Sequence, residues 1–104
     1  MKRIAFKMAL LPGCEAEYEK RHNEIWPQLV AELKTAGISD YSIFLDSETN
    51  SLFGVLKLTD EKALEALPTK EIMQQWWAYM GDIMQTNDDG SPRSLPLKEV
   101  FYLP

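Results

Sequence analysis

The chain has 104 residues, of which 45% are hydrophobic and 26% are charged. These proportions are ordinary for globular proteins, so we expect a single folded domain over residues 1–104 rather than a disordered or fibrous chain. Sixteen acidic against eleven basic residues leave a net charge of -5, which argues against a nucleic-acid partner, because such binding depends on basic side chains. No apolar run reaches the roughly 18 residues that a membrane span requires, so we expect a soluble chain.

The sequence offers few groups that hold a cofactor. Its single cysteine, Cys14, cannot form a disulfide within the chain, and its single histidine, His22, leaves few strong ligands for zinc. It has no glycine-rich phosphate loop. We therefore expect neither a metal nor another cofactor.

The first third of the chain predicts a strand followed by a broken helix. Apolar residues alternate with polar or small ones over 2–10, which predicts a strand. Helical spacing then extends from Cys14 to Ala36, where Gly37 predicts a left-handed stop. Pro27 has no N–H to donate within a helix, so we expect a kink or a short break between Asn23 and Pro27.

Two strands, over 40–46 and 52–58, follow and are joined by a polar turn. The first strand places Tyr41 on the same face as two aliphatic side chains, and the second strand is apolar on both faces. A sheet that is apolar on both faces needs two covers. The helices of one chain can cover only one face, so we expect a second subunit on the other.

The rest of the chain predicts two helices and a last strand. A short helix begins at Asp60, and a longer one over 69–84 carries a broad apolar stripe. After a polar loop over 86–94 we expect a final strand over 97–103. The order strand, helix, strand, strand, helix, strand predicts the ferredoxin-like α+β fold.

His22 is the first candidate for catalysis, because its ordinary pKa of about 6.5 lies near neutral pH. It shares a helix face with Tyr18 and Trp26, so we expect it to point toward the sheet. A histidine in that position is either a hydrogen-bonded core residue or a general acid or base in a cavity between helix and sheet. In the second case Tyr18, one turn earlier, would bring its hydroxyl to the same ligand.

Trp76 and Trp77 form the second candidate feature. Successive helical residues point about 100° apart, so both rings can flank one pocket. They either fill the core or form a platform for a sugar, with aromatic faces against its C–H groups and N–H groups toward its hydroxyls. Tyr41, which shares its face with aliphatic neighbours, is expected to direct a polar-tipped ring inward at the same place.

Three motifs together resemble those of the L-rhamnose mutarotase family, and the resemblance runs essentially end to end. The motifs are Tyr18-x-x-Arg21-His22-Asn23-x-Ile25-Trp26-Pro27, then Trp76-Trp77 with Tyr79-Met80, and the terminal Glu99-Val100-Phe101-Tyr102-Leu103-Pro104. The resemblance implies a dimeric α/β barrel, in which two ferredoxin-like subunits pack sheet to sheet. It also implies interconversion of the α and β anomers of L-rhamnose, in the cytoplasm and without a cofactor.

Transferred by position, the resemblance implies that His22 is the catalytic acid and that Tyr18, Tyr41, Trp76 and Trp77 contact the sugar. Anomer exchange requires that the pyranose ring open: one group protonates the ring oxygen while another removes the proton of the C1 hydroxyl. We expect His22 to be the proton donor. The base is Tyr18, a water that it holds, or His22 in its neutral form.

Two other functions remain open at this stage. Monooxygenases of the dimeric α/β barrel type, cofactor-independent or haem-degrading, could also use an inward histidine beside tryptophans. A non-catalytic sugar-binding module could use the same aromatic pocket, but it would leave anomer exchange at its rate in buffer.

Overall fold

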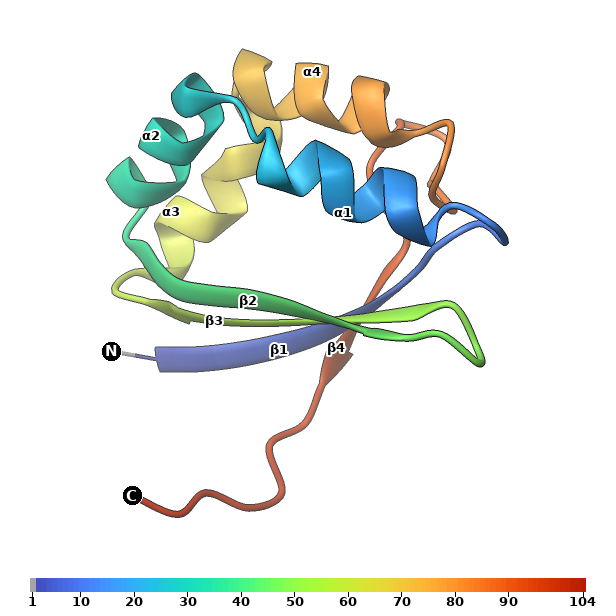
Figure 1. Ribbon diagram of the computed structural model, residues 1–104. Helices are drawn as coiled ribbons and strands as arrows, with labels where there is room; N and C mark the ends of the chain where they lie inside the picture. The colour runs from blue at the N-terminus through green and yellow to red at the C-terminus, as the bar shows by residue number, and fades with distance from the viewer. Residues whose placement is uncertain (1) are drawn as a thin grey trace.

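The computed structural model describes residues 2–104, so that Met1 of the expected domain lies outside the described residues. Its elements, in chain order, are β1 (Lys2–Ala9), α1 (Glu15–Asn23), α2 (Pro27–Thr35), β2 (Ile38–Asp46), β3 (Ser51–Leu58), α3 (Glu61–Ala66), the 3-10 turn η1 (Leu67–Thr69), α4 (Glu71–Met80) and β4 (Ser94–Leu97). The four α-helices form one layer over one face of the sheet (Figure 1). None of the helices within residues 2–104 combines the length and apolar character needed to cross a membrane.

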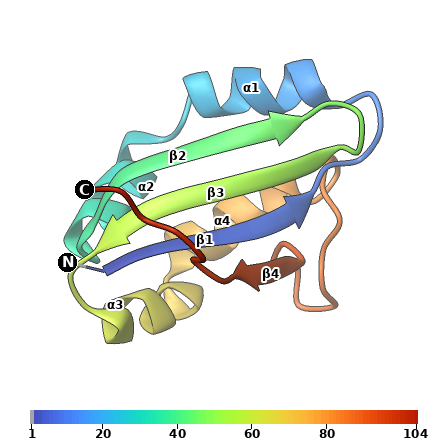
Figure 2. The ribbon, with the colours of Figure 1, turned by 90° about the horizontal axis from the view of Figure 1, so that it is seen from below.

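The four strands form one antiparallel sheet in the order β2-β3-β1-β4 (Figure 2). In the central pair, β1 and β3, Phe6 lies opposite Gly54, and at the edge Ala5 lies opposite Leu97. Together with the helix order, this arrangement confirms the predicted ferredoxin-like α+β fold.

Pro27 divides the first helical segment in two, as predicted. It is the first residue of α2, a position where its missing N–H costs nothing, and Trp26 before it is extended, with φ -65° and ψ 130°. As a result α1 ends at Asn23 and its last turn carries His22. The break also places Trp26 at the entrance to α2, beside that turn.

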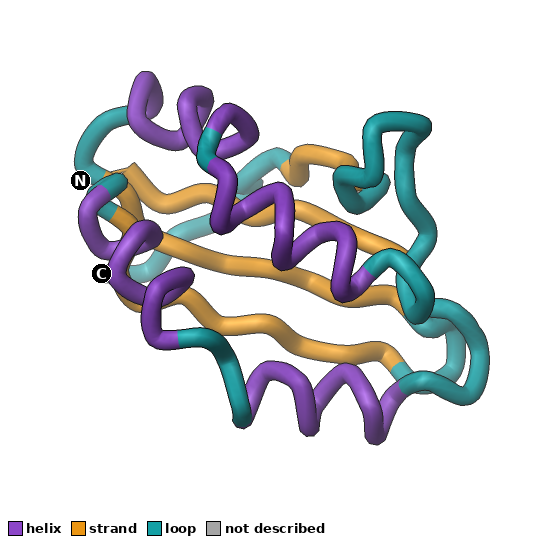
Figure 3. Tube along the Cα trace, turned by 90° about the horizontal axis from the view of Figure 1, so that it is seen from above, coloured by secondary structure: helices purple, strands orange, loops and turns teal. Residues whose placement is uncertain are grey.

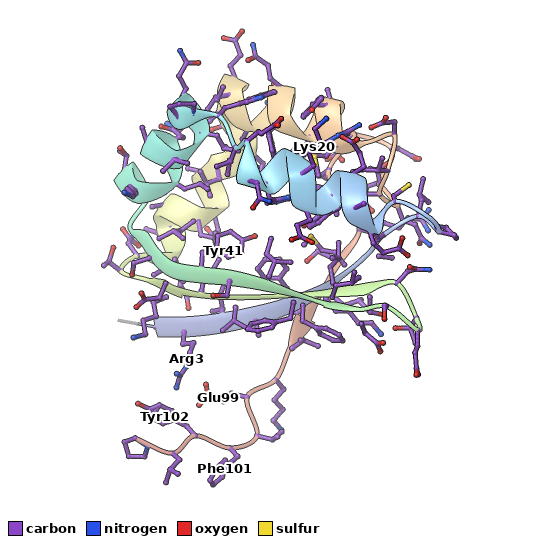
Figure 4. All side chains as sticks on the ribbon, viewed as in Figure 1. Arg3, Lys20, Tyr41, Glu99, Phe101 and Tyr102 are labelled. Carbon is purple, nitrogen blue, oxygen red and sulfur yellow. The ribbon has the colours of Figure 1, made fainter. Side chains whose placement is uncertain are left out.

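A β-bulge in β2 decides which way Tyr41 faces. Ser39 pairs with Lys57 and Ser42 with Val55, so β2 contains one more residue than β3 between these two pairs. Asp40 sits within the bulge with a φ of +48°. Because side chains alternate along a strand, the extra residue transfers the odd-numbered positions to the helix side, which is where Tyr41 lies (Figure 4).

The core lies between the helical layer and the sheet. Its most deeply buried large side chains are aliphatic: Leu10, Leu29, Leu52 and Leu58. Met8 and Met80 are buried in the same cluster, which joins β1 to α4. Burial of this apolar face fixes α4 on the sheet, and with it the two tryptophans that α4 carries.

The prediction that the long helix continues to residue 84 is wrong. The helix ends at Met80, and Gly81 follows as its C-cap. Met84 forms an isolated antiparallel bridge with Leu10, which draws the chain out of the helix and toward β1. Ile83 and Met84 are still buried, so their apolar spacing reflects packing in a turn rather than a further turn of helix.

The predicted final strand over 97–103 is also wrong, because β4 covers only Ser94–Leu97. Since Leu97 lies opposite Ala5, only the first residues of β1 remain for further pairing. The chain leaves the edge there, and residues 98–104, which we call the tail, run across the sheet face opposite the helices (Figures 1 and 2). Arg3 holds the tail, with its guanidinium 4.2 Å from the centre of the Tyr102 ring.

Candidate active site

All five side chains predicted for the site line one hollow. Tyr18 and His22 come from α1, Tyr41 from β2, and Trp76 and Trp77 from α4. The hollow has a volume of about 2020 Å³, which exceeds the roughly 300–1,000 Å³ of ordinary ligand pockets. The excess arises because its lining continues to the opposite face of the sheet, beneath the tail. The part between helices and sheet, where the five side chains meet, is the candidate active site.

One hydrogen bond indicates which ring nitrogen of His22 carries the proton. Its Nδ1 lies 3.0 Å from the backbone carbonyl oxygen of Tyr18. A carbonyl oxygen only accepts, so Nδ1 carries the proton and Nε2 is left with its lone pair. Burial lowers the pKa of His22, and the bond to the Tyr18 carbonyl offsets this effect only in part. At neutral pH the site therefore contains a neutral imidazole whose free nitrogen is Nε2.

Aromatic rings fix the orientation of this imidazole. The ring of Tyr18 lies 4.3 Å from that of His22, centre to centre, and Trp76 meets the imidazole edge to face at 5.5 Å. Trp26 in turn meets Trp76 edge to face at 5.0 Å. Such perpendicular contacts are a favourable geometry for aromatic pairs. Trp76 is only 6% exposed, so the wall behind His22 is built from core residues.

Four further polar groups belong to residues that line the site. They are the hydroxyls of Tyr18 and Tyr41 and the indole N–H groups of Trp76 and Trp77. Burial raises the pKa of Tyr41 to about 12 and raises that of Tyr18 further, so both phenols keep their protons at neutral pH. Each of the four groups can donate a hydrogen bond to a hydroxyl or ring oxygen of a ligand.

Phe6 supports the position of Tyr41. The two rings meet edge to face with their centres 6.1 Å apart. Phe6 lies over Gly54 on the neighbouring strand, and a Cβ at Gly54 would be 2.4 Å from the Phe6 ring. The absence of a side chain at Gly54 therefore makes room for the ring that holds Tyr41.

The sequence analysis missed the role of Arg21. Its Nη1 donates to Asp82 and to the backbone carbonyl of Tyr79, at 2.8 Å each, and its Nη2 donates to Asp82 at 3.2 Å. Its guanidinium also lies 4.3 Å from the centre of the Tyr79 ring. No spacing in the sequence predicts this cluster, because Asp82 is 61 residues further along the chain.

The described residues do not assemble a metal site. Within residues 2–104, no three His, Cys, Asp or Glu side chains gather in an arrangement that could hold a metal ion. Cys14 is a free cysteine at the start of α1, where its Sγ lies 3.7 Å from the carbonyl oxygen of Pro12. The side chains that line the hollow include an imidazole, phenols and indoles.

Several known proteins resemble this chain in sequence and in fold. Residues 3–103 match the family model described as L-rhamnose mutarotase. The L-rhamnose mutarotase of Jannaschia sp. (strain CCS1) is 57% identical over 104 residues, which cover the whole of both chains. The crystal structure of an L-rhamnose mutarotase from Formosa agariphila has a TM-score of 0.93 and 47% identity, again over the whole of both chains.

The fold also occurs in a second class of enzyme. A crystal structure of an antibiotic biosynthesis monooxygenase has a TM-score of 0.62 and covers 96% of this chain and 99% of that one. Its sequence identity is 12%, so this similarity shows the fold alone. The match to the family model and to full-length relatives decides between the two: the chain belongs to the L-rhamnose mutarotase family.

Proposed function

We propose that this chain is an isomerase that interconverts the α and β anomers of L-rhamnose by opening and closing the sugar ring at C1. One observation carries the proposal. A neutral histidine with a free Nε2 lines one aromatic-walled hollow together with four residues that carry hydrogen-bond donors. Together with membership of the family, this arrangement matches the needs of a sugar hemiacetal, which has one proton to move and several hydroxyls to hold.

The reaction moves one proton between two oxygen atoms that are both bonded to C1. Nε2 of His22 takes the proton of the C1 hydroxyl, the bond between C1 and the ring oxygen breaks, and the ring oxygen receives a proton. Because both oxygens lie on one carbon, the same nitrogen can accept the first proton and return it to the ring oxygen. His22 is thus a base that becomes the proton donor, which is one of the three candidates for the base that the sequence left open.

After ring opening, the aldehyde turns by half a turn about the C1–C2 bond, and the ring closes on its other face. The open-chain sugar must remain bound while it turns. The indoles of Trp76 and Trp77 offer faces for the C–H groups of the sugar, and the hydroxyls of Tyr18 and Tyr41 offer donors to its oxygens. These residues bind and orient the sugar while His22 moves the proton.

The test is the rate of anomer exchange, measured by saturation-transfer NMR on L-rhamnose in dilute buffer with and without the protein. General acid–base catalysis typically contributes ~10²–10⁴-fold, so we expect His22→Asn to lose exchange by about that factor. Tyr18→Phe is the matched control, because it keeps the ring beside His22 and the backbone carbonyl that bonds Nδ1. We expect this variant to retain more activity than His22→Asn.

Three outcomes distinguish the functions considered. Exchange at the wild-type rate in a folded His22→Asn variant contradicts the proposed role of the imidazole. Binding of L-rhamnose by the wild type without exchange above the rate in buffer identifies a sugar-binding module. Addition of haem that produces a Soret band, with turnover under reductant, identifies a haem-degrading monooxygenase.

We further propose that the protein works as a homodimer, in the cytoplasm, and that a second copy covers the sheet face opposite the helices. Phe44 and Leu95 on that face are 62% and 64% exposed, and the tail, whose apolar residues are also exposed, runs across the same face (Figure 2). Exposed apolar side chains that gather on one face are typical of an interface between proteins. The dimeric barrel implied by the sequence motifs joins subunits by this same face.

A further inference from the structure

The helix that carries His22 has few apolar contacts to hold it. Of the nine residues of α1, only Ala16 and Tyr18 are apolar, and Tyr18 is the only one that is fully buried. Most helices in globular proteins are fixed by a broad apolar face. Other contacts therefore contribute to the position of α1 over the sheet, and the Arg21 side chain makes several of them.

Arg21 joins the last turn of α1 to the C-terminal end of α4. Both helices lie over the same face of the sheet (Figure 3), and the Arg21 side chain spans the space between them. From α1 the guanidinium reaches the carboxylate of Asp82 with two nitrogens, the backbone carbonyl of Tyr79, and the face of the Tyr79 ring. A planar guanidinium bound at two points to a carboxylate fixes orientation as well as distance. We call these three residues, Arg21, Tyr79 and Asp82, the clamp.

The arginine of the clamp is largely buried, although the carboxylate of Asp82 that accepts its hydrogen bonds faces solvent. The side chain of Arg21 is 10% exposed, whereas that of Asp82 is 66% exposed. Hydrogen bonds from Arg21 lower the pKa of Asp82, so its carboxylate stays charged across the neutral range. Glu17 also accepts a hydrogen bond from Arg21, at 2.8 Å, but it lies on α1 itself and cannot connect the two helices.

A chain of rings connects the clamp to the catalytic imidazole. Tyr79 stacks on Trp26 at 5.5 Å with 28° between the ring planes, and Trp26 meets the edge of Trp76. Trp76 in turn meets His22, which is the residue next to Arg21. The path from Arg21 through Tyr79, Trp26 and Trp76 therefore returns to the same turn of α1. The contacts of the clamp and the rings around His22 therefore form one continuous set between α1 and α4.

We propose that Arg21 is a positioning residue for anomer exchange: by clamping α1 to α4 through Tyr79 and Asp82, it fixes the His22 imidazole against the sugar-binding indoles. This inference rests on the proposed function. Displacement of a catalytic group by about 1 Å can cost roughly 10²-fold in rate. The sugar-binding indoles stay in place on α4, which the core anchors independently.

Two variants, Arg21→Lys and Asp82→Asn, test the clamp. Lysine keeps the charge but cannot bind the carboxylate with two nitrogens, and asparagine at the exposed position 82 removes the charge with little effect on packing. We expect each variant to lower kcat by about tenfold or more and to change KM by less than threefold. The double variant should lose little more than either single one, because both remove the same contact. Glu17→Gln, which removes only the contact within α1, should stay within twofold of the wild type.

A second readout does not depend on activity. His22 is the only histidine in the chain, so its imidazole signals can be assigned and titrated directly by NMR. We expect the pKa of His22 to rise toward 6.5 in Arg21→Lys and Asp82→Asn, because a looser α1 admits water to the imidazole. The Glu17→Gln variant should keep the wild-type value.

The two readouts separate the inference from the proposed function. Both clamp variants are measured at a temperature well below their melting temperatures. If the wild type exchanges anomers and both variants keep its kcat and its His22 pKa, the inference is overturned. A fall in melting temperature alone, with both quantities unchanged, shows a purely structural contact and overturns it as well. If the wild type shows no exchange, the proposed function fails, and an unchanged His22 titration then rejects the positioning role independently.

Discussion

The imidazole of His22 has one hydrogen-bond partner among the described residues, the Tyr18 carbonyl, and burial lowers its pKa below the ordinary value. The proposed mechanism begins with a neutral imidazole. Activity should therefore be full above the lowered pKa and should fall as the pH drops through it. We predict that kcat/KM stays level from pH 7 upward and declines on the acid side with a pKa below 6.5.

This profile distinguishes two orders of proton transfer. If His22 had to be protonated before the sugar bound, kcat/KM would instead fall as the pH rose through the same pKa. The measurement needs a check on folding. Because the pKa of His22 is lower in the folded chain than in the unfolded chain, the unfolded chain binds more protons, so stability decreases below about pH 6.5. Circular dichroism at each pH shows over which pH range the protein stays folded. The values of kcat/KM can be compared within that range.

Removing only the hydroxyl of Tyr41 should affect sugar binding and leave the fold intact. That hydroxyl belongs to a residue that lines the hollow, and burial keeps it protonated with a pKa of about 12. Loss of one hydrogen bond costs about 0.5–1.5 kcal/mol, so Tyr41→Phe should raise KM by up to roughly tenfold. The melting temperature should not change. An unchanged KM would show that the sugar does not reach Tyr41.

Sequence reasoning located these side chains because they lie at recognisable spacings. Tyr18 and His22 are four residues apart, which places them on one face of α1, and Trp76 and Trp77 are adjacent on α4. The clamp could not be found in this way. Arg21 stands among the charged residues of a helix and Asp82 stands alone in an apolar stretch, and only the tertiary fold brings them together.

At the scale of elements, the break at Pro27 was predictable and the bulge at Asp40 was not. Proline excludes a helical N–H and forces the preceding residue into an extended conformation, so its effect follows from covalent structure. The bulge depends on the register between β2 and β3, which no local pattern specifies. The expected strand over 40–46 nevertheless places Tyr41 on the correct face, because Tyr41 keeps the alternation of the odd-numbered residues that follow it in β2.

Gly54 links this register to the site, and its replacement should disturb Tyr41 from a distance. The Cβ of alanine would lie 2.4 Å from the Phe6 ring, so the ring must move, and overpacking of this kind costs typically 1–3 kcal/mol. We predict that Gly54→Ala lowers the melting temperature and raises KM, because Phe6 no longer supports Tyr41.

A double variant tests the route of this effect. In Gly54→Ala with Phe6→Leu, the smaller side chain leaves room for the new Cβ. We expect the double variant to recover part of the stability that Gly54→Ala loses, but not the KM, since the edge-to-face contact with Tyr41 is gone. Full recovery of both quantities would mean that Phe6 does not act through Tyr41.

At the scale of the whole molecule, the order of elements followed from the change between period-two and helical patterns along the chain, and the sheet order agrees with it. The tail is the exception. Its apolar residues led to the prediction of a strand, yet Val100, Phe101 and Leu103 are largely exposed and contact no strand partner in this chain. We infer that these side chains are apolar because they contact a second copy of the chain, and not because they pair within the subunit.

Charge placed on the open sheet face should separate the proposed dimer. Phe44 lies opposite Phe53 on β3 and is exposed in the subunit, so an aspartate there leaves the fold intact. In a dimer the same carboxylate would be buried without a partner, at a cost of several kcal/mol. We expect the wild type to sediment as a dimer and Phe44→Asp as a monomer, whereas Ser47→Asp, in the turn after β2, should remain dimeric. A monomeric wild type would contradict the proposal.

The activity of the separated subunit then shows whether the site is complete in one chain. Tyr18, His22, Tyr41, Trp76 and Trp77 all line the hollow of the same subunit, so a folded Phe44→Asp monomer should retain its His22 titration and bind L-rhamnose. However, the hollow continues beneath the tail, and the second copy would cover that end. We therefore predict that the monomer keeps kcat within about tenfold but has a raised KM, because water enters from the open face and competes for the sugar-binding donors. Complete loss of exchange in a monomer with a normal His22 titration would mean that the partner subunit supplies a catalytic group.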